Sequence, residues 1–233
     1  MKIVFDNYNH DKECTSLWGF SLYVEEHKLL FDTGSNGRVL LANIKKMGID
    51  VSDIKYIFIT HTHWDHMGGI DSIIELNSDL TVFLPKSMSR NFVKDLETQV
   101  KEVIVCGEKP EKIFDGVYTT GTMKKDRSIE AEQSLILDNE YPVLITGCSH
   151  NGIDNVAKVA RDALNKDLKA VVGGLHLRIA SEKKILDVID KLKELGVEKT
   201  VPTHCAGDLC IELFEKHFGE GYIKGGAGKV FTL

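Results

Sequence analysis

A dense run of potential metal ligands constrains this chain more than any other feature of its sequence. His61, His63, Asp65 and His66 place three imidazoles and one carboxylate within six residues. Neutral imidazole and carboxylate are ligands that Zn²⁺ and similar divalent ions prefer. The run directly follows residues 54–59, an apolar and β-branched stretch that predicts a buried strand. The sequence therefore predicts a metal site where this strand ends.

The spacing of these four side chains favours two ions. His61 and His63 are two residues apart and point to the same side if the extended backbone continues that far. Asp65 and His66 follow where the chain has to turn, before a pair of glycines. One pair can hold a first ion while the other pair reaches a second ion from a neighbouring direction.

The rest of the sequence alternates strands and helices without a visible domain boundary. The helix over 181–195 has the clearest signals, because Ser181 is a suitable cap, apolar residues recur on one face and Gly196 is a suitable stop. Residues 86–133 carry no readable motif, and we expect substrate specificity to lie in loops there. Other predicted strands cover 3–5, 19–24, 29–31, 81–84, 103–106, 135–137, 143–146, 170–172 and 199–201, and other predicted helices cover 39–47, 69–76, 87–100 and 153–164.

The motif HxHxDH after an apolar strand resembles the signature of the metallo-β-lactamase fold superfamily. Residues 28–34, a strand that ends in Asp and a Gly turn, resemble its first motif. Residues 146–150, 173–176 and 202–205 each follow an apolar run and match its later motifs in order and approximate spacing. The resemblance covers nearly the whole chain. It implies an α/β fold, a four-layer αββα sandwich of two mixed β-sheets flanked by helices, formed by residues 1–233 as a single domain.

The resemblance also implies ligands beyond the first run. His204 stands where the last motif places a ligand of the second ion. The usual upstream histidine is absent from residues 128–134, and Cys148 stands where a bridging aspartate is usual. His150 is the favoured source of the missing imidazole. Cys148 as a thiolate ligand and Glu132 as a weaker substitute remain open alternatives.

These considerations give a set of predicted site residues. The predicted metal ligands are His61, His63, Asp65, His66, His150 and His204. They would hold two divalent ions, zinc first and manganese or iron as alternatives. Asp32 is expected to accept hydrogen bonds from the histidine loop rather than to bind metal. Asp65 and His176 are the predicted catalytic residues: Asp65 orients the attacking hydroxide, and His176 protonates the leaving group or holds a substrate phosphate.

Three later motifs resemble one branch of the superfamily, which is named for 7,8-dihydropterin-6-methyl-4-(β-D-ribofuranosyl)aminobenzene-5′-phosphate synthase. They read Gly-Cys-Ser-His over 147–150, Gly-Gly-Leu-His-Leu over 173–177 and Pro-Thr-His-Cys over 202–205. The branch implies a phosphorylated or pterin-like small molecule. It usually carries Glu-His-Gly-x-Ser before the first motif, whereas residues 17–21 read Leu-Trp-Gly-Phe-Ser. This departure leaves the substrate unassigned.

Composition narrows the partners and the compartment. The net charge of −6 disfavours a nucleic acid as the partner. No stretch approaches the roughly 18 apolar residues of a membrane span, and the first residues become polar too soon for a secretory signal. The five cysteines form no disulfide framework. We therefore expect a cytoplasmic protein that acts on a small molecule, and the oligomeric state is not predicted.

The leading functional hypothesis is a metal-dependent hydrolase with a binuclear site. It would act on an ester, thioester, lactone, amide or phosphodiester. One alternative is an iron-dependent redox protein such as a sulfur dioxygenase. The other is a non-catalytic ligand sensor that retains the metals.

Overall fold

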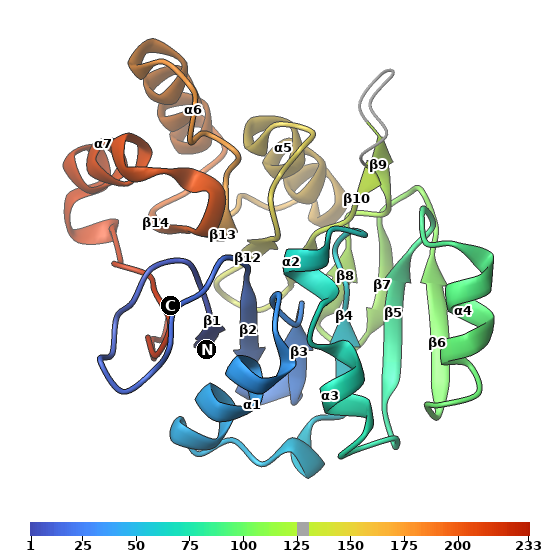
Figure 1. The fold of residues 1–233 in the computed structure, drawn as a ribbon. Coiled ribbons are helices and arrows are strands. Elements are labelled where there is room, and N and C mark those ends of the chain that lie inside the picture. Colours follow the sequence, from blue (N-terminus) through green and yellow to red (C-terminus); the bar gives the residue numbers. More distant parts are fainter. Residues whose placement is uncertain (125–130) are drawn as a thin grey trace. The chain divides into compact units, whose positions relative to one another are not determined.

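The structure is a computed structural model that describes residues 1–124 and 131–233. Contacts divide the chain into two compact units, Met1–Cys106 with Gly225–Thr232, and Gly107–Lys224 with Leu233. Each unit contains a six-stranded mixed sheet with its own helices (Figure 1). The predicted α/β class with two mixed sheets and helices is confirmed. The single domain stays a prediction, and the predicted specificity region 86–133 lies partly outside the described residues.

The first unit contains a sheet whose strands follow chain order. Its strands are β1 (Lys2–Phe5), β2 (Ser21–Val24), β3 (Leu29–Phe31), β4 (Tyr56–Phe58), β5 (Thr81–Pro85) and β6 (Glu102–Cys106). The pairs from β1 to β3 are antiparallel and those from β3 to β6 are parallel. Its helices are α1 (Gly37–Lys46), α2 (Trp64–Met67), α3 (Ile70–Ile74) and α4 (Arg90–Leu96), with 3-10 turns η1 (Glu25–His27) and η2 (Val51–Asp53).

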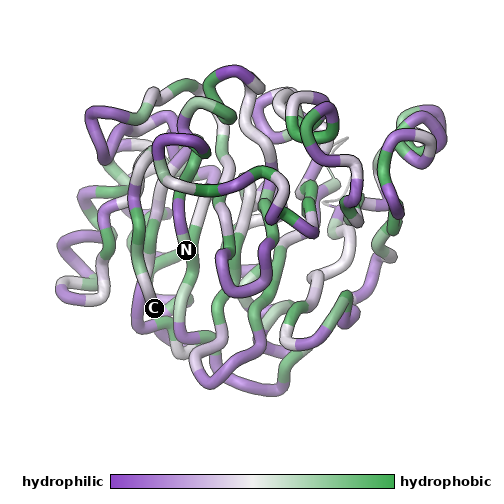
Figure 2. The backbone as a smooth tube through the Cα atoms, turned by 90° about the horizontal axis from the view of Figure 1, so that it is seen from below, coloured by the Kyte–Doolittle hydropathy of each residue, from purple (hydrophilic) through white to green (hydrophobic). Residues whose placement is uncertain are grey.

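Burial accounts for the apolar runs in this sheet. Every residue of β3 and β5 is buried, and strands of a parallel sheet that is covered on both faces read as continuous hydrophobic stretches. Hydrophobic stretches follow the strands in Figure 2, whereas hydrophilic residues dominate the loops. Helix α1 begins where the Asn36 side chain accepts the Val39 N–H at 3.1 Å, and it buries Leu40 and Ile44 in the core of the unit.

The second unit has a sheet with strand order β14-β13-β12-β11-β8-β7 and a separate hairpin, β9–β10. Its strands are β7 (Glu111–Phe114), β8 (Val117–Thr119), β9 (Met123–Lys124), β10 (Ala131–Glu132), β11 (Leu135–Leu137), β12 (Val143–Thr146), β13 (Ala170–Gly174) and β14 (Lys199–Thr203). Its helices are α5 (Ile153–Leu164), α6 (Glu182–Glu194) and α7 (Asp208–Phe218), with 3-10 turns η3 (His204–Ala206) and η4 (Gly219–Gly221). In neither unit is any described helix long and apolar enough to cross a membrane.

The parallel strands of this unit determine where its motifs lie. Strands β12, β13 and β14 are parallel neighbours, so their carboxyl ends meet at one edge of the sheet. Residues 147–150, 175–176 and 204–205 follow these three ends. Ligands of open α/β sheets bind at the carboxyl ends of strands. The unit therefore collects three of the predicted motifs at one edge.

The signals that predicted the boundaries of α6 are present in the structure. The Ser181 side chain accepts the Lys184 N–H at 3.3 Å. After the helix, Gly196 adopts a left-handed conformation with φ of 89°. Glycine adopts this conformation without the steric strain of a Cβ, so the helix can end here.

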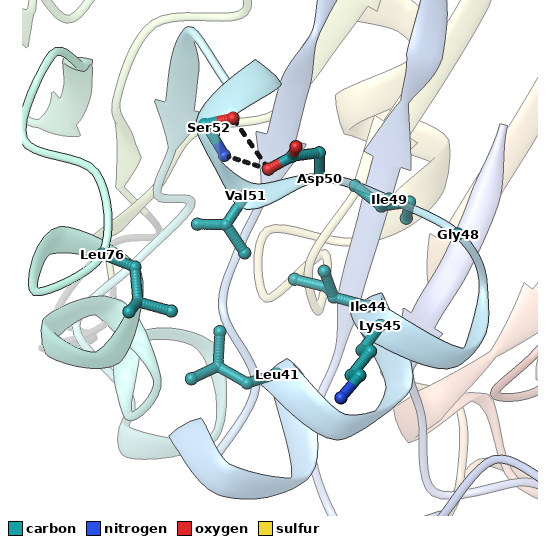
Figure 3. A pocket seen from close by; sticks show the side chains of 9 residues that line it. All are labelled: Leu41, Ile44, Lys45, Gly48, Ile49, Asp50, Val51, Ser52 and Leu76. Carbon is teal, nitrogen blue, oxygen red and sulfur yellow. Dashed lines mark hydrogen bonds between the residues drawn. The ribbon is translucent and has the colours of Figure 1, made fainter.

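A surface pocket of about 620 Å³ lies in the first unit, away from the predicted ligands (Figure 3). Leu41 and Ile44 of α1, Val51 and Ser52 near η2, and Leu76 contribute to its lining. The N–H and the hydroxyl of Ser52 donate hydrogen bonds to the Asp50 carboxylate at 2.9 and 2.7 Å. These bonds close the 3-10 turn at the rim of the pocket. None of the six predicted metal ligands lines it, so the strand ends remain the candidate site.

Candidate metal centre

The histidine run of the first unit forms a compact cluster after β4. His61 and His63 have ring centroids 4.5 Å apart, and those of His61 and His66 are 4.2 Å apart. The Asp65 carboxylate lies 3.7 Å from Nε2 of His66. The predicted turn at Asp65 and His66 is one turn of helix, α2, which starts after an extended His63. This helical turn brings His66 back beside His61, although His61 comes from the strand end.

Asp32 fixes the orientation of the cluster, as predicted. Its carboxylate accepts the N–H and hydroxyl of Thr60, both at 2.8 Å, and contacts Nδ1 of His66 at 2.7 Å. Burial raises the pKa of Asp32, and the contacts with His66 and Thr60 oppose that rise. Nδ1 of His61 lies 2.8 Å from the Thr60 hydroxyl. With Nδ1 of both rings engaged in this way, Nε2 is the nitrogen that can bind a metal.

Close backbone contacts join the Asp32 loop to α2. Thr33 donates its N–H to the carbonyl of His66 at 2.6 Å, and its hydroxyl donates to the same oxygen at 3.1 Å. Gly69 makes this approach possible, because a Cβ there would lie 2.3 Å from the Thr33 carbonyl oxygen.

We expect Gly69→Ala to lower the free energy of unfolding by about 1–3 kcal/mol, the usual cost of overpacking a tight site. The added methyl group would meet backbone rather than a flexible side chain. Denaturant unfolding measures the change, with Gly107→Ala as the matched control because its Cβ would meet only Glu111 at 3.6 Å. Equal stability of the two variants would contradict the contact.

Glu132 does for the second unit what Asp32 does for the first. Its carboxylate accepts the backbone N–H groups of Cys148, Ser149 and His150 at 2.7, 3.0 and 2.9 Å. It also contacts Nδ1 of His150 at 2.8 Å. Glu132 therefore holds the loop after β12 and leaves Nε2 of His150 as the nitrogen for a ligand. The sequence suggested Glu132 only as a substitute ligand, because nothing local relates β10 to this loop.

We expect Glu132→Gln to weaken metal binding by about 10–100-fold, as is typical when a group that orients a ligand is lost. An amide has a donor where the carboxylate accepts, so at least one N–H of the loop loses its partner. Competition with a chelator measures the affinity, and thermal unfolding of the apoprotein measures stability. Glu140→Gln, on an exposed turn, is the control. A loss of stability with unchanged affinity would make Glu132 a structural residue only.

Two thiols and three histidines surround the ends of β12, β13 and β14. The Cys148 sulfur lies 3.4 Å from Nε2 of His204, and the Cys205 sulfur accepts the His176 N–H at 3.3 Å. The rings of His150 and His176 have centroids 4.6 Å apart. Burial alone would raise the pKa of Cys205, but hydrogen bonds with Cys148 and His176 outweigh it and lower that pKa to about 6.

Strained backbone gathers at these strand ends. Among the described residues, six other than glycine have positive φ. Three of them follow β12, β13 and β14, and a fourth follows β3 of the first unit. Asp32, Ser149, His176 and His204 have φ of 51°, 63°, 52° and 51°. Each such conformation costs of order 1–3 kcal/mol and persists where the surroundings impose it, most often at functional sites. In the second unit, strain therefore marks the loops that carry His150, His176 and His204.

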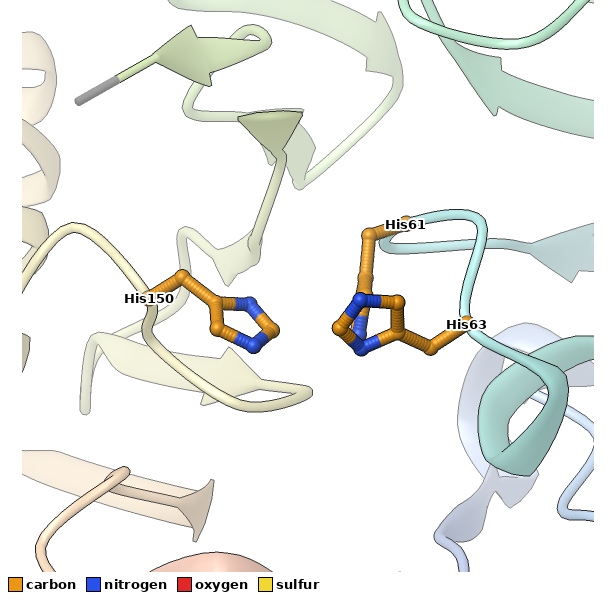
Figure 4. A group of neighbouring side chains, drawn as sticks. All are labelled: His61, His63 and His150. Carbon is orange, nitrogen blue, oxygen red and sulfur yellow. The ribbon is translucent and has the colours of Figure 1, made fainter. Parts of the chain in front are cut away.

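The structure divides the six predicted ligands between the units. The first unit carries His61, His63, Asp65 and His66, and the second carries His150 and His204. Figure 4 shows His61 and His63 on the loop after β4 and His150 on the loop after β12. The imidazoles and carboxylate of the first unit and the two imidazoles of the second unit are donors that suit a divalent ion of the zinc type.

Comparison with known proteins agrees with this chemistry. The family model of the metallo-beta-lactamase superfamily matches residues 19–80. The crystal structure of Tm1679, a metal-dependent hydrolase of the beta-lactamase superfamily, has a TM-score of 0.82 and 27% identity, covering 100% of this chain and 98% of that one. The chain is thus similar to proteins of the metallo-β-lactamase superfamily in sequence and in fold, as its motifs predicted.

Two curated proteins of Methanocaldococcus jannaschii are also similar. The 7,8-dihydropterin-6-methyl-4-(beta-D-ribofuranosyl)-aminobenzene-5'-phosphate synthase is 28% identical over 88% of this chain and 84% of its own length. An uncharacterized protein is 26% identical over the whole of both chains. The predicted resemblance to the synthase branch is confirmed.

Proposed function

We propose that the chain is a metal-dependent hydrolase that holds two divalent ions, zinc first, through His61, His63, Asp65, His66, His150 and His204. The superfamily generally binds divalent metals, and its fold is that of hydrolases such as Tm1679. Similarity to this superfamily supports the proposal.

One observation carries this proposal. His66 and His150, in different units, each present Nδ1 to a buried carboxylate at 2.7 and 2.8 Å. Such carboxylate–histidine pairs fix the tautomer and raise the basicity of a ligating imidazole. One such pair could serve packing alone, but two buried carboxylates that each orient an imidazole suit metal binding better.

The proposed chemistry divides between the ions and the chain. When bound at these residues, divalent ions would supply a nucleophile at neutral pH and would stabilise developing negative charge. Asp65 helps to hold the second ion and accepts a hydrogen bond that orients the nucleophile. His176 is exposed and follows β13, so its imidazole can reach a bound molecule and protonate the leaving group or hold a phosphate.

The proposed substrate is a small molecule with an ester, lactone or phosphodiester group, phosphorylated or pterin-like. Similarity to a synthase whose name contains a ribofuranosyl 5'-phosphate and a dihydropterin supports this class. The reaction need not be that of the synthase, because identity is only 28%.

The test combines metal content with turnover. Elemental analysis should find about two divalent ions per chain, and hydrolysis of generic esters, lactones or phosphodiesters should disappear with a chelator and return with zinc or manganese. His61→Ala should lower both quantities, whereas exposed His217→Ala should not. One ion or fewer after reconstitution, or turnover that survives the chelator, would overturn the proposal.

A further inference from the structure

We propose that Cys148, His176 and Cys205 form a separate site for a thiophilic ion such as Cd²⁺ or Zn²⁺ at the carboxyl edge of the second unit's sheet. Their donor atoms, two sulfurs and one imidazole nitrogen, all lie within 4.8 Å of one another. This donor set differs from the imidazole and carboxylate set proposed for the hydrolytic ions.

The arrangement suits tetrahedral coordination. Thiolates bind zinc at about 2.3 Å and imidazole at about 2.0 Å, so donors on one tetrahedral ion are about 3.5–3.8 Å apart. Small side-chain adjustments bring three atoms within 4.8 Å to that spacing. Two cysteines and one histidine leave a fourth position for water or another ligand. Both thiols are buried and His176 is exposed, so the ion would be reached from the side of His176.

The backbone leaves room for the Cys205 sulfur. A Cβ on Gly174 would lie 2.8 Å from that sulfur and 2.1 Å from the Gly147 carbonyl oxygen. Glycine at the end of β13 thus permits the thiol to lie between two strand ends. The strained conformation of His176, with φ of 52°, places its backbone N–H on the same sulfur at 3.3 Å.

Occupation of this site would affect the reaction, a consequence that rests on the proposed function. Binding of the ion by two thiolates and one neutral imidazole releases to the solvent the protons that the thiols still carry. The imidazole lone pair of His176 is then donated to the ion, so His176 can neither accept nor pass on a proton. The site would act as an inhibitory one for thiophilic ions.

The direct test is Cd²⁺ titration of the reduced, metal-replete protein. Thiolate-to-cadmium charge transfer in the ultraviolet should appear and saturate at one equivalent beyond the hydrolytic ions. Cys148→Ala and Cys205→Ala should each remove about half of this band. Each should also weaken Cd²⁺ binding by at least 10-fold, because loss of a group that only orients a ligand already costs about that much. His176→Ala should weaken binding similarly and keep the band at saturation.

Two variants serve as controls. Cys210→Ala removes a buried thiol of α7 in the same unit, and it should leave the band unchanged. His61→Ala should lower hydrolytic metal content without changing the band, which separates the two proposals. Alkylation followed by mass spectrometry, without any substitution, should find Cys205 protected by Cd²⁺.

Three outcomes would overturn the site. They are the absence of a charge-transfer band, a Cys205 that Cd²⁺ does not protect, and a band that depends on Cys148 alone. The last result would assign Cys148 to the hydrolytic ions beside His204 and would leave the proposed function standing. If the metal-replete protein showed the charge-transfer band but no metal-dependent turnover, the proposed function would be rejected and the thiolate site would stand.

Discussion

Asp65→Asn is expected to lower metal content and turnover together. The Asp65 carboxylate is buried, 6% exposed, and lies 3.7 Å from Nε2 of His66. An amide of the same shape removes the negative charge that helps to neutralise an ion. Loss of a group that only orients a ligand already costs about 10–100-fold in affinity, and loss of a ligand should cost at least as much.

Elemental analysis measures the metal content, and the rate constant for hydrolysis is measured on the same preparation. Asp71→Asn, on an exposed position of α3, is the matched control and should keep both values. The backbone carbonyl of Asp65, which accepts the Phe20 N–H at 3.1 Å, is present in the variant, so the loop should fold. If the variant kept its full metal content but lost turnover, Asp65 would act on the substrate and would not be a metal ligand.

Local sequence signals predicted much of this molecule. Helix α6 was predicted from Ser181, one apolar face and Gly196, which are all within the segment itself. The strand ends were predicted from apolar runs that stop at polar motifs. The role of Asp32 was predicted from its place beside a Gly turn, and its bonds with Thr60 and His66 confirm it.

What the sequence did not reveal depends on pairing between distant segments. Glu132 lies on a two-residue strand, and its bonds to the loop at 148–150 join residues 16 to 18 positions apart. Cys148 and Cys205 come together only because β12, β13 and β14 are parallel neighbours. Short strands have weak periodicity, and no pattern within them reports the register of a partner.

Segment length also explains the shift in element boundaries. The strand predicted over 54–59 is regular only over Tyr56–Phe58, and the turn predicted at Asp65 is the four-residue helix α2. One turn of helix has no hydrophobic period to recognise. Tertiary contacts such as that of Thr33 with the His66 carbonyl hold this turn in place.

His176→Ala is expected to reduce turnover by about 10²–10⁴-fold, the usual contribution of a general acid or base, while the hydrolytic ions stay bound. His176 is exposed on the loop after β13 and is not one of the proposed hydrolytic ligands. If His176 is the acid, wild-type activity falls as pH rises through its pKa, because the proton to be donated is lost. The variant should therefore lack the basic limb of the pH–rate profile.

The control is His217→Ala, an exposed histidine of α7 in the same unit, for which the rate and its pH dependence should not change. An acid is needed most when the leaving group is poor, so the loss in His176→Ala should shrink for substrates with good leaving groups. A loss of equal size for both would point to phosphate binding. Loss of the hydrolytic ions would make His176 a ligand of that centre, and unchanged turnover would leave it a structural residue.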